Sequence, residues 1–372
     1  MAERFSLKDH LFNAETVTRL GGHFEDAGVF EAAPFVADVL ADMGPLELKA
    51  RINLIAEVLV RYLPQDFPAA AEAIISALPP PLDPKLKDDD FGHFIYAPLG
   101  VYVERHGLED HRDLGLDVLE QVTQRFSMEY SIRAFLNRWQ DATLERMQDW
   151  VRHDHYHVRR LVSEGTRPKL PWGQAIKVTS ADTLPLLDQL HADPTRFVTR
   201  SVTNHLNDIT KKDPQLVIAR LEDWQKVGQQ ATKELTWMRK HALRGLIKAG
   251  DPDAMLHLGY RPDVAVTLSH FGITPDTLAR GESAEVVMTL TVDNDAPLIV
   301  DYVIDFVKAN GTTAPKTFKM KVLDAKAGKP VTLSKMHLFK DNATTFTLYP
   351  GAHHLHAQIN GRVIASAPFT LT

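Results

Sequence analysis

The sequence predicts a multidomain protein whose first part is helical and whose last part is a small β-sandwich. Two patterns carry this prediction. From about residue 10 to residue 250, apolar side chains recur at three- and four-residue spacing, the period of an amphipathic helix. After GDPDA, residues 250–254, apolar and polar side chains alternate, as they do in a half-buried strand. At 372 residues the chain also exceeds the usual size of one domain, so we expect domains over residues 1–257 and 258–372.

The helical region consists of separate amphipathic segments. LELKARINLIAEVLVRYL, residues 46–63, and LVIARLEDW, residues 216–224, both show the helical period. Between them, LPPPLDPKLKDDD, residues 78–90, is rich in proline and charge. That composition predicts a connector, so the helices on either side of it belong to different units.

A 40-residue repeat lies in the second half of the helical region. HVRRLVSE (157–164), FVTRSVTN (197–204) and WMRKHALR (237–244) align without gaps. Helical repeats of this length are typical of a HEAT-like solenoid, which stacks pairs of helices. In each repeat we expect an apolar pair to be buried and a cation to point away from that seam. The apolar pairs are Val158 and Val162, Val198 and Val202, and Met238 and Ala242, and the cations are Arg160, Arg200 and Lys240.

The last part of the chain has the pattern of short strands. EVVMTLTV (285–292) and YVIDF (302–306) alternate between apolar and polar side chains. HLHAQINGRVIASAPFTLT (354–372) places Asn360-Gly361 between two alternating runs, which is a strong hairpin signal. Several such strands with no helix between them predict an immunoglobulin-like β-sandwich.

Composition excludes several classes of site. The chain has no cysteine, which excludes disulfides, thiolate catalysis and zinc sites built on sulfur. MAERFSLKDHLF at the N-terminus lacks the basic start and apolar run of a signal peptide, and no apolar stretch approaches the length of a membrane span. We therefore expect a cytoplasmic monomer with no membrane partner.

The charge is distributed unevenly along the chain. The net charge of −6 hides a value of −12 for residues 1–150, from 14 Lys and Arg against 26 Asp and Glu. Residues 151–250 carry +7, from 17 Lys and Arg against 10 Asp and Glu. A concentrated basic region of this kind predicts phosphate binding, and a solvated basic helix surface is the alternative.

RRLVSEGTRPKLPW, residues 159–172, opens this basic region. Gly165 is a candidate left-handed helix stop, and the prolines after it prevent the helix from continuing. Glu164 is therefore expected at a helix end, where it either compensates cations or is presented to a ligand that they bind. Those cations are Arg159, Arg160, Arg167 and Lys169.

Two further carboxylates lie in or near the basic region: Glu129 in RFSMEYSIRAFL (125–136) and Asp208 in RSVTNHLNDITKKDP (200–214). Each of the three carboxylates has a structural alternative at helix-pair spacing. The possible partners are Arg133 for Glu129, Arg160 for Glu164, and Lys211 and Lys212 for Asp208.

Trp172 and the histidines leave further alternatives open. Trp172 follows a proline-rich loop and is either a core residue or an exposed ring that stacks on a sugar or base. His153 and His157 have a spacing that binds metal, and so do His354 and His356 on a strand, but no further ligand is fixed by the sequence. We therefore expect no metal site.

Several of these segments resemble a known family. SMEYSIRAFL (127–136), HYHVRRLVSEGTRPKLPW (155–172) and RSVTNHLNDITKKDP (200–214) are similar to the characteristic segments of AlkC-type DNA alkylation repair proteins, relatives of AlkD. LELKARINLIAEVLVRYLP (46–64) and HFIYAPLGVYV (93–103) extend the likeness over roughly residues 5–255. The C-terminal sandwich resembles the immunoglobulin-like appendage of one AlkC subgroup.

The resemblance implies a monofunctional DNA glycosylase of base excision repair. Such an enzyme removes small N-methylated bases, chiefly N3-methyladenine and N3-methylcytosine, from duplex DNA without turning them into a deep pocket, and it needs no cofactor. The positions that match the family's active site are Glu129, Glu164, Asp208 and Trp172. The cations expected to hold DNA are Arg159, Arg160, Arg167, Lys169, Arg200, Lys211, Lys212 and Lys240, with the protein associated with the nucleoid when it is bound.

Two alternative functions, from classes other than DNA glycosylases, remain open. In the first, the solenoid is a non-catalytic scaffold for DNA or protein, and the carboxylates are salt-bridge partners. In the second, the sandwich is an adhesion module and the helices are its platform, which the missing export signal disfavours.

Overall fold

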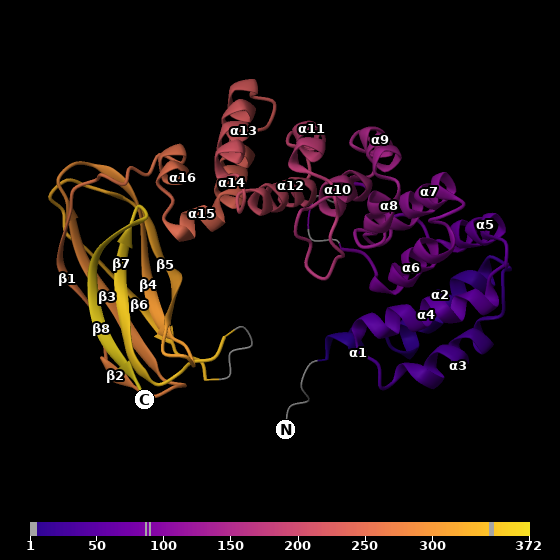
Figure 1. The fold of residues 1–372 in the computed structure, drawn as a ribbon, viewed down its shortest axis with the longest axis horizontal. Coiled ribbons are helices and arrows are strands. Elements are labelled where there is room, and N and C mark those ends of the chain that lie inside the picture. The colour runs from indigo at the N-terminus through magenta and orange to yellow at the C-terminus, as the bar shows by residue number, and fades with distance from the viewer. Residues whose placement is uncertain (1–5, 86–87, 89–90, 342–345) are drawn as a thin grey trace. The chain divides into compact units, whose positions relative to one another are not determined.

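The computed structural model describes residues 6–85, 88, 91–341 and 346–372. The chain divides into two compact units. Unit 1 comprises Met1–Asp213 and Arg220–His241, and unit 2 comprises Pro214–Ala219 and Ala242–Thr372. Helices occupy the first part of the chain and strands the last part, so the predicted fold class is confirmed (Figure 1).

Most helices follow one another with short connections, and longer segments join α5 to η1 and α10 to α11. Their bounds are α1 Leu7–Leu11, α2 Ala14–Asp26, α3 Ala32–Met43, α4 Leu48–Tyr62, α5 Phe67–Ala77, η1 Phe94–Tyr96, α6 Ala97–His106, α7 Arg112–Thr123, α8 Ile132–Arg138, α9 Gln140–Trp150, α10 Tyr156–Gly165, α11 Ser180–Leu190, α12 Arg196–Ile209, α13 Pro214–Val227, α14 Thr232–Ala242, α15 Arg244–Ala249 and α16 Pro252–His257. The predicted segment at residues 46–63 is α4, and the described residues of the predicted connector lie outside the helices. None of the helices in the described residues is both long and apolar enough to span a membrane.

The predicted repeat corresponds to α10, α12 and α14. Both apolar positions are buried in all three helices, since none of the six side chains is exposed: Val158, Val162, Val198, Val202, Met238 and Ala242. Within unit 1, α10 packs against α12, and α9 and α11 lie beside this pair (Figure 1). The predicted buried seam is therefore confirmed. Packing along this seam holds α10 against α12.

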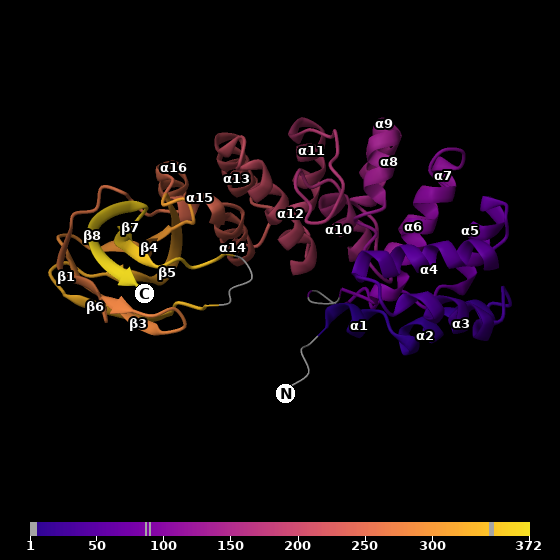
Figure 2. The ribbon, with the colours of Figure 1, turned by 60° about the horizontal axis from the view of Figure 1, so that its bottom comes forward.

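Unit 2 contains two sheets that face each other (Figure 2). One sheet has the order β1-β3-β6 and the other β2-β8-β7-β4-β5, with antiparallel pairing except between β2 and β8. The bounds are β1 Val266–Thr274, β2 Thr277–Leu278, β3 Ser283–Val292, β4 Ala296–Val307, β5 Thr313–Ala325, β6 Val331–Leu338, β7 Gly351–Ile359 and β8 Arg362–Leu371.

The predicted alternation fills the core between these sheets. Met288, Leu290 and Val292 of β3 are buried at alternate positions, whereas β4 is buried on both faces over most of its length. Asn360 and Gly361 join β7 to β8 and both have positive φ angles, 46° and 82°, as a tight hairpin turn requires. The hairpin prediction is confirmed.

This turn lies very close to the end of α15. A Cβ atom on Gly250 would lie 2.4 Å from the carbonyl oxygen of Gly361, and one on Gly361 would lie 2.6 Å from that of Gly250. Gly250 also ends α15 in the left-handed region, with φ 75°. Only glycine allows both the conformation and the backbone contact.

We expect Gly250→Ala to lower the free energy of unfolding of unit 2 by at least about 2 kcal/mol, because the added methyl group is strained and also displaces the hairpin. Denaturant unfolding measures this loss. Gly272→Ala is the matched control, since no described atom lies within 4 Å of its Cβ position. Equal stability of the two variants would contradict the account of this contact.

Candidate active site

Each of the three predicted carboxylates lies in or next to a helix terminus in unit 1. Glu129 precedes α8, Glu164 is in the last turn of α10, and Asp208 is in the last turn of α12. α10 ends at Gly165, as predicted, but Gly165 is not left-handed, so the predicted conformation of this helix stop is wrong. The glycine is needed for packing instead, because a Cβ atom there would lie 2.5 Å from Ile132 of α8.

The carboxylates alternate with cations in a continuous cluster, which we call the charged row. Its members are, in order, Glu129, Arg160, Glu164, Arg167, Asp208 and Lys211. Arg160 Nη1 donates to Glu129 Oε2 at 2.9 Å, and Nη2 lies 3.7 Å from Glu164 Oε2. Ser127 donates its hydroxyl to the same Glu129 oxygen at 2.9 Å.

The second half of the charged row joins α10 to α12. Arg167 donates to Glu164 Oε1 at 2.6 Å and to Asp208 Oδ2 at 3.0 Å. Lys211 donates to Asp208 Oδ1 at 2.9 Å, as its helix-pair spacing predicted. Ser201 donates to the remaining oxygen of Glu164 at 2.6 Å. The row thus brings together three carboxylates that are far apart in the sequence.

Glu164 is ionised at the centre of this row although it is almost fully buried. Burial alone would raise the pKa of its carboxyl, but Arg160 and Arg167 beside it and the Ser201 hydroxyl lower it further than burial raises it. The same contacts raise the pKa of both guanidinium groups against the effect of burial. The site therefore holds a negative charge in one fixed position.

Arg133 supports the loop after α10 and does not pair with Glu129, contrary to one structural alternative drawn from the sequence. Its side chain is buried and donates to the carbonyl oxygens of Gly165 at 2.8 Å, Arg167 at 2.9 Å and Gln174 at 2.6 Å. These bonds hold both ends of the segment that carries Trp172. Sequence spacing could not reveal this, because the acceptors are backbone atoms of a distant loop.

Trp172 is an exposed ring and not a core residue. Its side chain is 63% exposed, its φ is 65°, and its carbonyl oxygen accepts a hydrogen bond from Lys49 Nζ at 2.8 Å. A positive φ is uncommon for a bulky residue and persists where the surroundings impose it. Of the two alternatives from the sequence, the structure therefore has the exposed ring.

The predicted cations fall into three groups. Arg160, Arg167 and Lys211 belong to the charged row. Arg159 is paired with Asp193, at 2.5 Å, and Arg200 is paired with Asp88, so both charges are already compensated within unit 1. The remaining three are exposed: Lys169, Lys212 and Lys240.

The buried side chain of His205, in α12, contacts the residue before Glu164. His205 has no exposed surface, and its Nδ1 lies 3.1 Å from the carbonyl oxygen of Ser163, which can only accept a hydrogen bond. Nδ1 therefore carries the hydrogen. Burial lowers the pKa of His205 to about 4, so the ring is neutral at pH 7. Neither His205 nor Ser201 has a sequence signal, because each resembles an ordinary polar residue of a helix.

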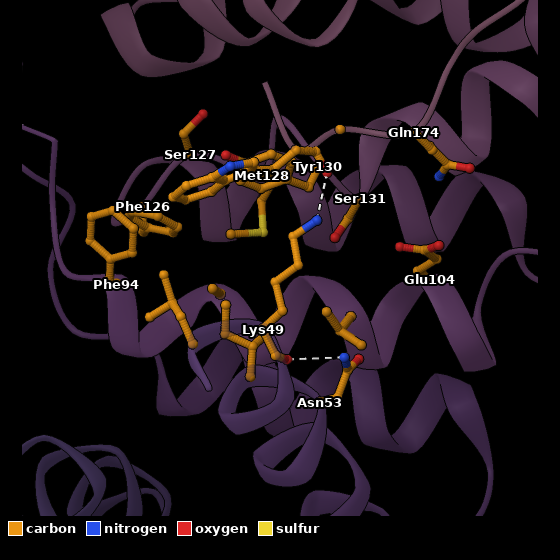
Figure 3. A pocket seen from close by; sticks show the side chains of 16 residues that line it. Lys49, Asn53, Phe94, Glu104, Phe126, Ser127, Met128, Tyr130, Ser131 and Gln174 are labelled. Carbon is orange, nitrogen blue, oxygen red and sulfur yellow. Dashed lines mark hydrogen bonds between the residues drawn. The ribbon is translucent and has the colours of Figure 1, made fainter. Parts of the chain in front are cut away.

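A cavity of about 350 Å³ lies beside the charged row in unit 1 (Figure 3). Ser127, which donates to Glu129, lines this cavity together with residues of α4, η1 and α6, of the segment 126–131 before α8, and of the segment 172–174. The histidines at 153 and 157 lie elsewhere: His153 approaches Glu120, and His157 packs on Phe197. Among the described residues, no three His, Asp or Glu side chains are grouped to hold a metal ion.

Two family models and a curated relative match this chain. Residues 112–246 match the family described as DNA alkylation repair enzyme, and residues 267–372 match the C-terminal immunoglobulin-like domain of YhaZ. The uncharacterized protein YhaZ of Bacillus subtilis (strain 168) is 32% identical over 369 residues, which are 96% of this chain and 98% of YhaZ.

A solved structure matches the entire chain. The alkylpurine DNA glycosylase AlkC of Pseudomonas fluorescens, bound to DNA containing an abasic site analog, has a TM-score of 0.88 and 32% sequence identity. The match covers 99% of this chain and 100% of that one. This chain belongs to the AlkC-type DNA alkylation repair family. Within that family match, the helical repeats and the sandwich each have their counterpart, as the resemblance of the sequence segments predicted.

We expect His205 to make the stability of this AlkC-type protein depend on pH. The folded state keeps the ring neutral with a pKa of about 4, whereas the unfolded chain binds a proton near the ordinary value of 6.5. The stabilising contribution of the neutral His205 ring is present above pH 6.5 and is lost as the pH falls towards 4. Over this range the free energy of unfolding therefore decreases by about 3 kcal/mol.

Denaturant unfolding between pH 7 and pH 4 tests this expectation with His205→Gln, which should lose less stability than the wild type over that range. His10→Gln is the control, since His10 is exposed in α1. Equal losses in the wild type and His205→Gln would mean that His205 is already charged in the folded protein.

Proposed function

We propose that this protein is a monofunctional DNA glycosylase that excises cationic N-methylated bases, chiefly N3-methyladenine and N3-methylcytosine, from duplex DNA. The observation that carries the proposal is the charged row, with ionised Glu164 at its centre and the exposed Trp172 ring in the loop that follows. Its relative AlkC was solved on DNA with an abasic site analog, which resembles the product of such a reaction.

The chemistry needs little from the protein. A base methylated at N3 is already positively charged, so it is a good leaving group and no general acid is required. As the N-glycosidic bond breaks, the base leaves with the bonding electron pair and becomes neutral. Positive charge then develops on the sugar, water forms the new bond to the sugar carbon, and a proton of that water passes to solvent.

Glu164 fits the demand for negative charge near the sugar. Arg167 and Ser201 hold its two oxygens, so the carboxylate does not have to reorient when positive charge develops. Glu129 and Asp208 lie on either side of it in the row, and we propose that they share the tasks of placing the sugar and the water. Glycoside hydrolases use one carboxylate at the sugar in a similar way. Their second carboxylic acid, which protonates the leaving group, is not needed for a base that is already cationic.

The exposed cations fit the demand for phosphate binding. Lys169, Lys212 and Lys240 are exposed, and Lys169 lies in the same loop as Trp172. We propose that these lysines hold phosphates near the lesion while Trp172 contacts the deoxyribose or an adjacent base. The lesion then reaches the carboxylates without being turned into a deep pocket, and neither metal nor cofactor takes part.

We expect Glu164→Gln to lower the rate of base release in a single turnover by about 100-fold or more, because the variant keeps the shape but not the negative charge. The assay uses duplex DNA that contains N3-methyladenine, with DNA binding measured in parallel. Glu129→Gln and Asp208→Asn in the same assay rank the other two carboxylates.

Glu72→Gln, on the exposed face of α5, is the matched control and should release base at the wild-type rate. If neither the wild type nor any variant releases base while binding is tight and sensitive to salt, the helical unit is a scaffold for DNA and the enzymatic proposal fails. The ion pairs of the charged row are compatible with that second function, so base release is the measurement that decides.

We expect Lys169→Gln and Lys212→Gln each to weaken DNA binding and to reduce the dependence of log K on log salt concentration by about 1. Binding isotherms at several salt concentrations measure this slope for lesion-bearing and undamaged duplexes. The loss should be similar for both, because phosphate contacts carry no information about the base. Unchanged slopes would place the phosphates on other residues.

A further inference from the structure

The cavity beside the charged row has walls suited to a small planar ring. Its lining combines aromatic and aliphatic side chains with a few polar groups. Its volume of about 350 Å³ falls at the lower end of the range for small-molecule sites, roughly 300–1,000 Å³. In Figure 3, Phe94 and Phe126 lie at one end of the cavity, and Glu104 and Gln174 lie at the other.

Four aromatic side chains contribute to the wall of the cavity. Phe94 and Phe126 pack on each other with ring centroids 4.4 Å apart, and Tyr130 and Trp172 also line the cavity. Tyr130 is 36% exposed and Trp172 is 63% exposed, so both rings keep surface available for stacking. Met128 adds a polarisable sulfur to the same wall. A flat heteroaromatic ring is the ligand class that such a wall accepts.

Glu104 supplies an unused polar group. It lies in α6, is half-buried, and has no hydrogen bond or ion pair with any described residue. Burial raises the pKa of its carboxyl, although the neighbouring Arg105 lowers it in part. Because the side chain is only partly buried, the carboxyl stays accessible to a ligand in the cavity. Lys49, in contrast, is already bonded to the Trp172 carbonyl.

The cavity is continuous with the charged row. Ser127 lines the cavity and donates its hydroxyl to Glu129, and Tyr130 follows Glu129 directly in the chain. Negative charge on Glu129 and Glu164 also contributes to the raised pKa of Tyr130, about 12, after burial as the main cause. A group released at the row therefore has an adjoining place to bind.

We propose that this cavity is a product site that holds the free N-methylated purine base after its bond to the sugar is broken, with its ring against the aromatic wall and its polar edge on Glu104. The proposal rests on the proposed glycosylase function for the class of ligand. It assigns Glu104 and the aromatic wall to binding of the released base, and it leaves bond cleavage to the charged row.

The polar edge of a released base suits Glu104 in either protonation state. The neutral base has ring nitrogens that accept a hydrogen bond, and a protonated carboxyl group donates one. If the base carries the proton instead, the carboxylate accepts a charge-assisted hydrogen bond. One proton between the two groups therefore gives a bonded pair in both arrangements.

Direct titration of the full-length protein with free 3-methyladenine tests the proposal, with isothermal titration calorimetry as the readout. A base of this size should bind with a dissociation constant on the order of 0.1–1 mM. Glu104→Met removes the polar group and should weaken binding about tenfold. Ala97→Leu places extra carbons in the cavity and should also weaken binding, without touching Glu104. Glu72→Gln is the control with unchanged affinity.

The same preparations are assayed for single-turnover base release, so that the two proposals fail separately. Release without saturable binding of 3-methyladenine overturns the product site and leaves the glycosylase proposal standing. Binding that is equal in the wild type, Glu104→Met and Ala97→Leu also overturns the product site, because the base then binds elsewhere. Binding that both variants weaken, with release at the wild-type rate, supports it. No release from the wild type overturns the glycosylase proposal itself.

Discussion

The ion pairs between Arg160, Glu164 and Arg167 are the interaction on which the candidate site depends. A buried carboxylate is unfavourable by itself, and a buried guanidinium is too, so each requires the other nearby. Because Arg160 reaches Glu129 and Arg167 reaches Asp208, this one pairing also positions the outer carboxylates. Losing one member would leave a buried charge uncompensated, which makes the row rigid as well as charged.

That rigidity has a structural basis in the helices that carry the row. Seams of buried valines fix α10 against α12, and Arg133 fastens the loop that follows α10 through three backbone carbonyls. A preorganised carboxylate is effective only if it does not move when charge develops at the substrate. The packing of apolar seams and the chemistry of the row are thus parts of one arrangement.

The cavity adds a different environment next to the same site. The charged row is polar and paired throughout, whereas the adjoining cavity combines aromatic and aliphatic side chains with the carboxyl of Glu104, which has no partner among the described residues. Trp172 lines this cavity, with an exposed ring and a backbone conformation that its loop imposes. Charge stabilisation and ring stacking can therefore take place in adjacent regions of one helical unit.

The sequence alone determined the order of helices and strands, the buried repeat positions and the Asn360-Gly361 hairpin, because periodicity and turn chemistry are local properties. It also singled out Glu129, Glu164 and Asp208, and helix spacing offered Arg160 and Lys211 as partners of the last two. It could not reveal the partners of cations that bind distant groups: Arg133 donates to backbone carbonyls, and Arg159 pairs with Asp193. Those choices depend on distances between residues more than 30 positions apart, which only the tertiary structure sets.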